Sequence, residues 1–130
     1  AGGRLCTEAE WERAANGPGS ERRAHPWGNQ EANYDLVNIP STGPGWLDPV
    51  DSHPDGMSYD GIYNMEGNVY EWVVDKFALY EVSDEGPMVD PLAATTSAND
   101  EFIGRGSCFF TEPKRSVTDR TRFEKTFDWG

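Results

Sequence analysis

The segment between Asn64 and Glu71 carries oxygen donors on both sides of a glycine. It consists of Asn64-Met65-Glu66-Gly67-Asn68-Val69-Tyr70-Glu71. Calcium takes about six to eight hard oxygen ligands from side chains, carbonyls and water. A glycine turn can direct several carbonyls inward while side chains at either end add oxygens, so the segment is a candidate calcium site. The residues alone favour a simpler explanation, in which Asn64 caps a turn, Gly67 meets a need for positive φ, and Glu71 is a surface strand residue.

The chain has two cysteines, Cys6 and Cys108, and two histidines, His25 and His53. The cysteines are consistent with one disulfide or with two free thiols, and the sequence does not decide between them. A structural zinc site is not expected, because these four residues do not stand at zinc-finger spacing. Each histidine precedes a proline and is expected in a turn. A metal triad built on them would need an added Asp or Glu.

Composition and charge restrict the classes of partner. A net charge of −12 over 130 residues provides no basic footprint for phosphate, so nucleic acid is not an expected partner. An acidic surface suits divalent cations or cationic ligands, although solvation alone explains it. No apolar run reaches the length of a membrane span, and the first residues do not resemble a signal peptide. The length suits one compact domain, whose core the many aromatic side chains can supply.

One helix is predicted from Glu8 to Asn16. Thr7 before it and Glu10 three residues later form a capping box, and acidic residues in the first turn favour the helix dipole. Gly17 is a suitable residue to end the helix.

The rest of the chain combines long loops with a few short strands. From Pro18 to Gly61 no hydrophobic period holds, which predicts ordered loops pinned by aromatic side chains or by bound metal. Strands are predicted at Val69–Asp75, at Glu101–Phe110, where glycines indicate a bulge or a close approach, and at Arg115–Phe123.

Several blocks of this sequence resemble, in order, the formylglycine-generating enzyme family, also called the sulfatase-modifying factor family. Residues 4–12, RLCTEAEWE, resemble its RLPTEAEWE helix start, and residues 25–29, HPWGN, resemble its YPWGN turn. Residues 61–72, GIYNMEGNVYEW, resemble its GLYDMxGNVWEW segment, and residues 105–109, RGSCF, resemble its glycine–serine strand. Residues 120–130 resemble the run into its terminal GFR motif.

The resemblance implies an α+β, C-type-lectin-like fold with few short strands, one or two helices and long irregular loops. The matched blocks come from the second half of family domains, which are about twice as long. Residues 1–130 are therefore expected to form a single domain of this type, the C-terminal part of a larger one. The missing half would belong to the same polypeptide or to a partner chain.

The resemblance also implies calcium sites. In family members that bind calcium, the ligands match the side chains of Asn64 and Glu71 and the carbonyls of Gly67 and Val69, and with this match calcium becomes the favoured explanation of the segment. A second family site matches the side chain of Asn38 and the carbonyl of Ile39, and an ordinary turn role is the alternative for Asn38. The family's partner acid would come from the loop of residues 41–48, which is short and has Asp48 as its only acid.

The resemblance places the family's catalytic cysteine pair at Thr111 and Ser116. Those cysteines bind copper(I), and hydroxyl groups do not replace thiolates for this soft ion. Cys108 lies three residues too early to match, and a lone cysteine in a strand is commonly a small buried hydrophobe. The ergothioneine-synthesis branch of the family instead binds iron through histidines on a separate domain that this chain lacks.

Two functions remain after this comparison. The first is a calcium-stabilised module that binds a protein or small-molecule ligand, without the copper- and cysteine-dependent formylglycine-forming activity. The second is a divergent copper or non-heme iron oxidase whose remaining site residues lie outside this chain. Its cleft candidates are Arg105, Ser107, Cys108, Arg120 and Arg122. The alternative for these arginines is ordinary pairing with acids. Calcium and an acidic surface favour the periplasm or the cell exterior.

Overall fold

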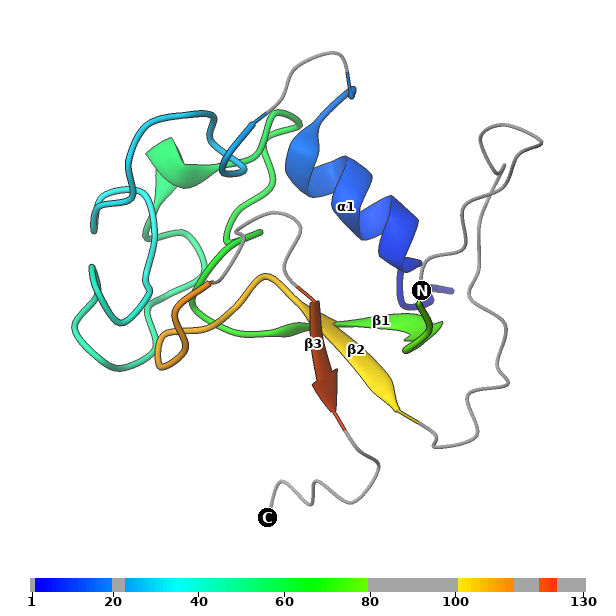
Figure 1. The fold of residues 1–130 in the computed structure, drawn as a ribbon. Helices are drawn as coiled ribbons and strands as arrows, with labels where there is room; N and C mark the ends of the chain where they lie inside the picture. Colours follow the sequence, from blue (N-terminus) through cyan, green and yellow to red (C-terminus); the bar gives the residue numbers. More distant parts are fainter. Residues whose placement is uncertain (1, 20–22, 80–100, 114–119, 124–130) are drawn as a thin grey trace.

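The computed structural model describes residues 2–19, 23–79, 101–113 and 120–123. The described elements are, in order, helix α1 (Glu8–Asn16), the 3-10 helix η1 (Pro54–Gly56), and strands β1 (Glu71–Lys76), β2 (Phe102–Arg105) and β3 (Arg120–Phe123). Figure 1 shows α1 above the small sheet, with the loops of residues 23–70 gathered to one side. One helix and an antiparallel sheet confirm the predicted α+β class with long irregular loops.

Helix α1 has the predicted bounds. The hydroxyl of Thr7 accepts a 3.1 Å hydrogen bond from the backbone N–H of Glu10, whose carboxylate accepts one of 2.7 Å from the N–H of Thr7. At the other end Gly17 adopts φ 74° and donates its N–H to the carbonyl of Arg13. The capping box and the glycine therefore set the two ends of the helix, as the sequence predicted.

The three strands form an antiparallel sheet in the order β1-β2-β3. Glu71 pairs with Arg105 and Phe102 pairs with Phe123, with an irregularity in the register of β1 between Trp72 and Lys76. Strand β1 begins two residues later than predicted, because the preceding residues belong to a tight turn. Strand β2 ends at Arg105, because the next two residues both take positive φ, 88° and 60°. The predicted start of the third strand at residue 115 lies outside the described residues.

The core lies between α1 and one face of the sheet. It consists of Trp11, Ala15, Met65, Val73 and Ile103. Successive side chains of a strand point to opposite faces, so alternate residues of β1 face the helix. The opposite face carries aromatic contacts among Tyr70, Trp72, Phe102 and Phe123.

Residues 23–70 contain no strand and only the short η1 helix. The lack of a hydrophobic period predicted this up to Gly61, whereas Val69 and Tyr70 were predicted to lie in a strand. A buried run of residues 36–39 anchors these loops. Gly56 of η1 packs directly against this run: a Cβ atom on Gly56 would lie 1.8 Å from the carbonyl oxygen of Leu36. The loops are therefore held by close backbone packing.

Among the described residues no helix has both the length and the apolar character needed to cross a bilayer.

Candidate metal site

The candidate calcium turn, residues 64–71, leads into β1 and contains three residues with positive φ. These are Asn64 at 54°, Gly67 at 78° and Asn68 at 62°. Gly67 also packs closely against the backbone of Asn38, since an added Cβ would stand 2.6 Å from the Asn38 carbonyl oxygen. Its N–H donates a 2.6 Å hydrogen bond to the carbonyl of Gly106. The need for glycine at this position is therefore both conformational and steric.

The oxygen donors of the turn have unused acceptor capacity. Asn64 is oriented by a 2.7 Å hydrogen bond from its Nδ2 to the carbonyl of Val50, and no described residue donates to its Oδ1. Within the described ranges the carbonyl oxygens of Gly67 and Val69 likewise accept no hydrogen bond. These three oxygens are hard donors of the kind calcium takes.

Glu71 supplies the carboxylate of the turn. Its Oε2 accepts a hydrogen bond from the indole N–H of Trp11 on α1. Burial raises the pKa of Glu71, and the bond from Trp11 opposes that rise only in part. No Lys, Arg or His of the described residues forms an ion pair with this carboxylate. A half-buried carboxylate without a cation is destabilised in its charged form, so a bound cation would complete its surroundings.

The second candidate site, at Asn38 and Ile39, has fewer open oxygens. The carbonyl of Ile39 already accepts the N–H groups of Thr42, at 3.0 Å, and Gly43, at 2.7 Å. The side chain of Asn38 donates from Nδ2 to the carbonyl of Trp46 at 2.9 Å. Its Oδ1 is buried and has no hydrogen-bond partner among the described residues. One unsatisfied oxygen therefore remains for a ligand at this position.

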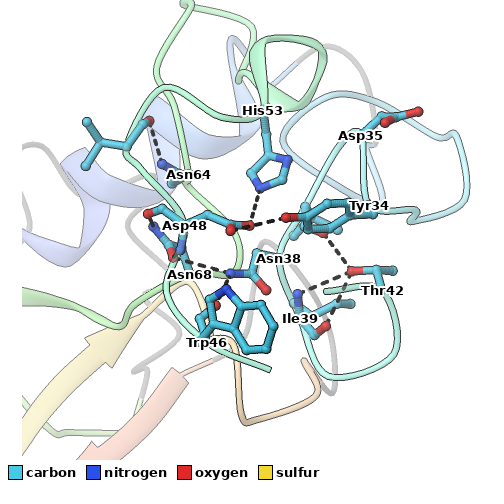
Figure 2. A network of polar contacts seen from close by, with 12 residues as sticks. Tyr34, Asp35, Asn38, Ile39, Thr42, Trp46, Asp48, His53, Asn64 and Asn68 are labelled. Carbon is cyan, nitrogen blue, oxygen red and sulfur yellow. Dashed lines mark hydrogen bonds and ion pairs between the residues drawn. The ribbon is translucent and has the colours of Figure 1, made fainter. Parts of the chain in front are cut away.

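Asp48, the acid expected near that second site, points to other partners. Figure 2 shows its carboxylate between Tyr34 and His53. The hydroxyl of Tyr34 donates to Oδ1 at 3.2 Å, and Nε2 of His53 lies 3.1 Å from Oδ2. Burial, followed by the contact with Asp48, raises the pKa of Tyr34. The sequence predicted His53 in a turn; the residue is instead the N-cap residue of η1, and its pairing with Asp48 was not predicted.

A second histidine joins two of the sequence blocks. Nδ1 of His25, in the turn that resembles the family's YPWGN, lies 3.1 Å from a carboxylate oxygen of Glu66 in the candidate calcium turn. The His25 ring stacks on Trp27 with centroids 4.5 Å apart and an interplanar angle of 4°. Glu66 is buried, and its partnership with His25 packs the two blocks together.

The two cysteines are wholly or partly removed from solvent. Cys6 and Cys108 are free thiols, and Cys108 is buried. Burial, and then the nearby Glu71, raise the pKa of Cys6. Thr111 donates its N–H to the carbonyl of Cys108, whereas Ser116 lies outside the described residues.

The arginine candidates are engaged in ion pairs. The guanidinium of Arg105 is buried and lies 2.7 Å from Glu8 and 2.8 Å from Glu12. Arg120 also binds Glu8, at 2.6 Å, and Arg122 lies 3.4 Å from Glu101. Ser107 is buried and accepts a hydrogen bond from the N–H of Gly67 at 3.2 Å. These contacts join α1, the sheet and the turn, and they give the residues structural roles.

No three His, Cys, Asp or Glu side chains in the described part of the chain gather where they could hold a metal ion. The candidate calcium turn is a different kind of site, because three of its four donors are amide oxygens. The turn thus offers hard oxygens with a single negative charge, which suits calcium better than a soft metal.

Part of this sequence is similar to known proteins. A family model described as "Sulfatase-modifying factor enzyme 1-like domain" matches residues 1–127. Formylglycine-generating enzyme of Bos taurus is 34% identical over 97 residues, which cover 65% of this chain and 25% of that protein. Inactive C-alpha-formylglycine-generating enzyme 2 of Mus musculus is 34% identical over 85 residues, which cover 58% of this chain and 27% of that protein. The chain thus spans about a quarter of the length of these relatives.

The fold is also found in a solved structure. Treponema denticola variable protein 1 matches with a TM-score of 0.75 and 24% sequence identity. The match covers 93% of this chain and 42% of that one. At this identity the similarity shows a shared fold and no more.

Proposed function

Because the chain belongs to the sulfatase-modifying factor enzyme 1-like domain family, we propose that it is a calcium-stabilised binding module without the copper- and cysteine-dependent formylglycine-forming activity. The membership confirms the resemblance inferred from the sequence blocks. The ligand of the module would be a protein or a small molecule. The chain spans about a quarter of the length of its relatives, so any statement about the activity of the whole protein is also a proposal.

The carboxylate of Glu71, which has no cationic partner among the described residues, is the observation that carries the calcium proposal. Taking a carboxylate out of water is costly unless a cation or several hydrogen bonds replace the water. Glu71 has one hydrogen bond from the described residues, from Trp11, and its raised pKa reflects that shortfall. A divalent cation next to Glu71 would remove the destabilisation.

Four residues would hold the ion: Asn64 through Oδ1, Gly67 and Val69 through their carbonyls, and Glu71 through its carboxylate. Calcium would supply a positive charge that binds these oxygens together and fixes the turn at the start of β1. Because ions that bind only the folded state stabilise it, calcium would contribute directly to folding. Asn38 and Ile39 would hold a second, weaker ion, supported by the unsatisfied Oδ1 of Asn38.

The absence of formylglycine-forming activity is supported by the residues that replace the cysteine pair. Thr111 and Ser116 match the positions of that pair, and neither is a thiol. The buried Cys108 is a poor substitute, since its position is three residues away and its side chain is closed to solvent. One relative is itself named an inactive formylglycine-generating enzyme, so loss of activity on this scaffold has a parallel.

Metal analysis combined with thermal unfolding tests the calcium proposal. We expect the purified protein to contain calcium, and its melting temperature to fall when a chelator removes the ion. At a free calcium concentration of about 100 times Kd the stabilisation should be about 2.7 kcal/mol. An unchanged melting temperature after chelation would refute the proposal. A calcium content above one ion per chain would support the second site.

A divergent oxidase is the alternative, and the kinship with active formylglycine-generating enzyme favours it. Its test is oxygen consumption by the copper- or iron-loaded protein in the presence of a cysteine-containing peptide. We expect none above the rate of the free metal. Stoichiometric copper or iron in the purified protein, together with oxygen uptake, would replace the binding module by the oxidase.

A further inference from the structure

Asn68 uses every one of its hydrogen-bonding groups within the protein. Its backbone N–H donates to the carbonyl of Asn38 at 2.8 Å, and its carbonyl accepts the N–H of Phe109 at 3.1 Å. Its side chain bonds the backbone of Asp48 twice: Nδ2 donates to the carbonyl at 3.1 Å, and Oδ1 accepts the N–H at 3.0 Å. Asn68 is 4% exposed. One residue therefore joins the candidate calcium turn to three other loops.

The paired bonds between the Asn68 side chain and the Asp48 backbone form a clamp, which is visible in Figure 2. The loop on the far side of the clamp is itself fixed. The carboxylate of Asp48 is buried between Tyr34 and His53, with side-chain exposures of 8% for Asp48 and 4% for His53. Two hydrogen bonds to the Asp48 backbone fix the orientation of the Asn68 carboxamide. Because the Asp48 loop is itself fixed, the clamp also holds the Asn68 backbone in place.

The place of Asn68 in the turn gives the clamp a consequence for metal binding. The residue stands between Gly67 and Val69, whose carbonyl oxygens accept no hydrogen bond from the described residues. The Gly67 carbonyl shares a peptide unit with the N–H of Asn68, so the hydrogen bond of that N–H to Asn38 fixes where this oxygen points. The next peptide unit, between Asn68 and Val69, is held by the bond from Phe109 to the Asn68 carbonyl. Asn68 also has a φ of 62°, a backbone angle that most residues other than Gly, Asn and Asp adopt only with strain. Fixing Asn68 thus fixes the carbonyl of Gly67, one of the four proposed calcium ligands, and holds the peptide unit that leads to Val69.

We propose that Asn68 is a positioning residue for calcium, which orients the carbonyl of Gly67 through its clamp on the backbone of Asp48. The proposal rests on the proposed calcium function and adds a residue that does not itself touch the ion. Partners of metal ligands typically change metal affinity by about 10- to 100-fold when they are lost. A weaker hold on the Gly67 carbonyl would let water replace it.

The test compares calcium binding by the wild-type chain and by two variants, using calorimetric titration of the calcium-free protein. Asn68→Gly removes the clamp while keeping a residue that tolerates positive φ, so the turn can still form. We expect its calcium affinity to fall by about 10- to 100-fold. Asn33→Gly is the matched control, because Asn33 also makes a side-chain bond in a loop, to the N–H of Asp35, away from the turn. It should bind calcium like the wild type.

The second variant, Asn68→Asp, separates positioning from charge. Its carboxylate can still accept the N–H of Asp48 but can no longer donate to the carbonyl. An added negative charge beside the ion would by itself strengthen calcium binding, whereas a damaged clamp would weaken it. We expect weaker binding. A second measurement should agree: terbium bound in place of calcium should show a shorter luminescence lifetime, because an extra water molecule enters its coordination sphere. Tighter binding would overturn the positioning role.

The outcomes distinguish this proposal from the one beneath it. If the wild-type chain binds neither calcium nor terbium, the calcium function and the positioning role both fall. If the wild type binds calcium and Asn68→Gly binds it equally well, the positioning role alone falls, even when the variant is less stable. Should Asn68→Gly fail to fold, the sign of the affinity change in Asn68→Asp decides the matter.

Discussion

The carboxylate of Glu71 on β1 accepts a hydrogen bond from the indole of Trp11 on α1 and faces no positively charged side chain of the described residues. A different arrangement surrounds Glu8 in the first turn of the same helix, where two guanidinium groups share one carboxylate. The two acids thus meet burial in different ways. Glu8 is neutralised by the protein, whereas no described residue supplies a cation for Glu71.

The substitution Glu71→Gln should abolish the calcium-dependent rise in melting temperature. Glutamine keeps an oxygen for the Trp11 indole but lacks the charge that attracts the ion. In calcium-free buffer the variant should be at least as stable as the wild type, because the raised pKa of Glu71 shows that its charge opposes folding. Thermal unfolding with and without calcium measures both effects.

Glu112→Gln is the matched control for this experiment. Glu112 is exposed and accepts a hydrogen bond from Ser41 at 3.2 Å, so its loss should leave the calcium effect unchanged. If calcium raises the melting temperature of Glu71→Gln as much as that of the wild type, Glu71 is not a calcium ligand.

The substitution Glu8→Gln should cost about 3–5 kcal/mol of unfolding free energy, because it leaves Arg105 and Arg120 with a buried charge that is no longer balanced. The side chains of Glu8 and Arg105 are 7% and 0% exposed, so water cannot take the place of the lost carboxylate. Urea denaturation gives the free energy. The surface pair of Arg13 and Asp60 is the comparison, and Asp60→Asn should cost about 0–1 kcal/mol. Equal losses in the two variants would show that burial does not govern the Glu8 network.

Glu10 should make the capping box sensitive to acid. The bond from Arg4, and then that from the N–H of Thr7, lower the pKa of Glu10 from 4.5 to about 2. A group whose pKa is lower in the folded state stabilises the fold above its unfolded pKa and loses that effect as pH falls through the folded value. The wild type should therefore melt higher than Glu10→Gln at pH 7, and the difference should shrink between pH 4.5 and pH 2. A difference that stays constant over this range would contradict the assignment.

The sequence predicted the bounds of α1 well and those of β1 less well. The signals for α1 are local, since Thr7, Glu10 and Gly17 act on backbone groups within a turn of themselves, and its bounds were predicted to the residue. Strand β1 was predicted to include Val69 because valine favours strands. The positive φ of Asn68 overrides that preference and keeps Val69 in the turn.

The candidate site divides along the same line. Its four proposed ligands lie within eight consecutive residues, so a motif could identify them. The contacts that support them join residues far apart in the chain: Asn68 to Asp48 across 20 positions and Glu71 to Trp11 across 60. No local pattern encodes such pairs. The nearest signal for Asp48 was its position as the only acid of its loop, and it suggested a metal ligand rather than a partner for His53.

The loops around the site depend on one close backbone contact, which Gly56→Ala tests. An alanine Cβ at this position would lie 1.8 Å from the carbonyl oxygen of Leu36 and 2.7 Å from its carbonyl carbon. Both atoms belong to the backbone of a buried run and cannot rotate away, so η1 or the run must move. Overpacking of this kind typically costs about 1–3 kcal/mol. Because the run continues into Asn38, whose carbonyl accepts the N–H of Asn68, the movement should also weaken calcium binding.

Gly19→Ala is the control, since its Cβ would meet nothing within 4 Å, and neither its stability nor its calcium affinity should fall. Loss of stability in Gly56→Ala with unchanged calcium affinity would show that the turn keeps its shape independently of the run.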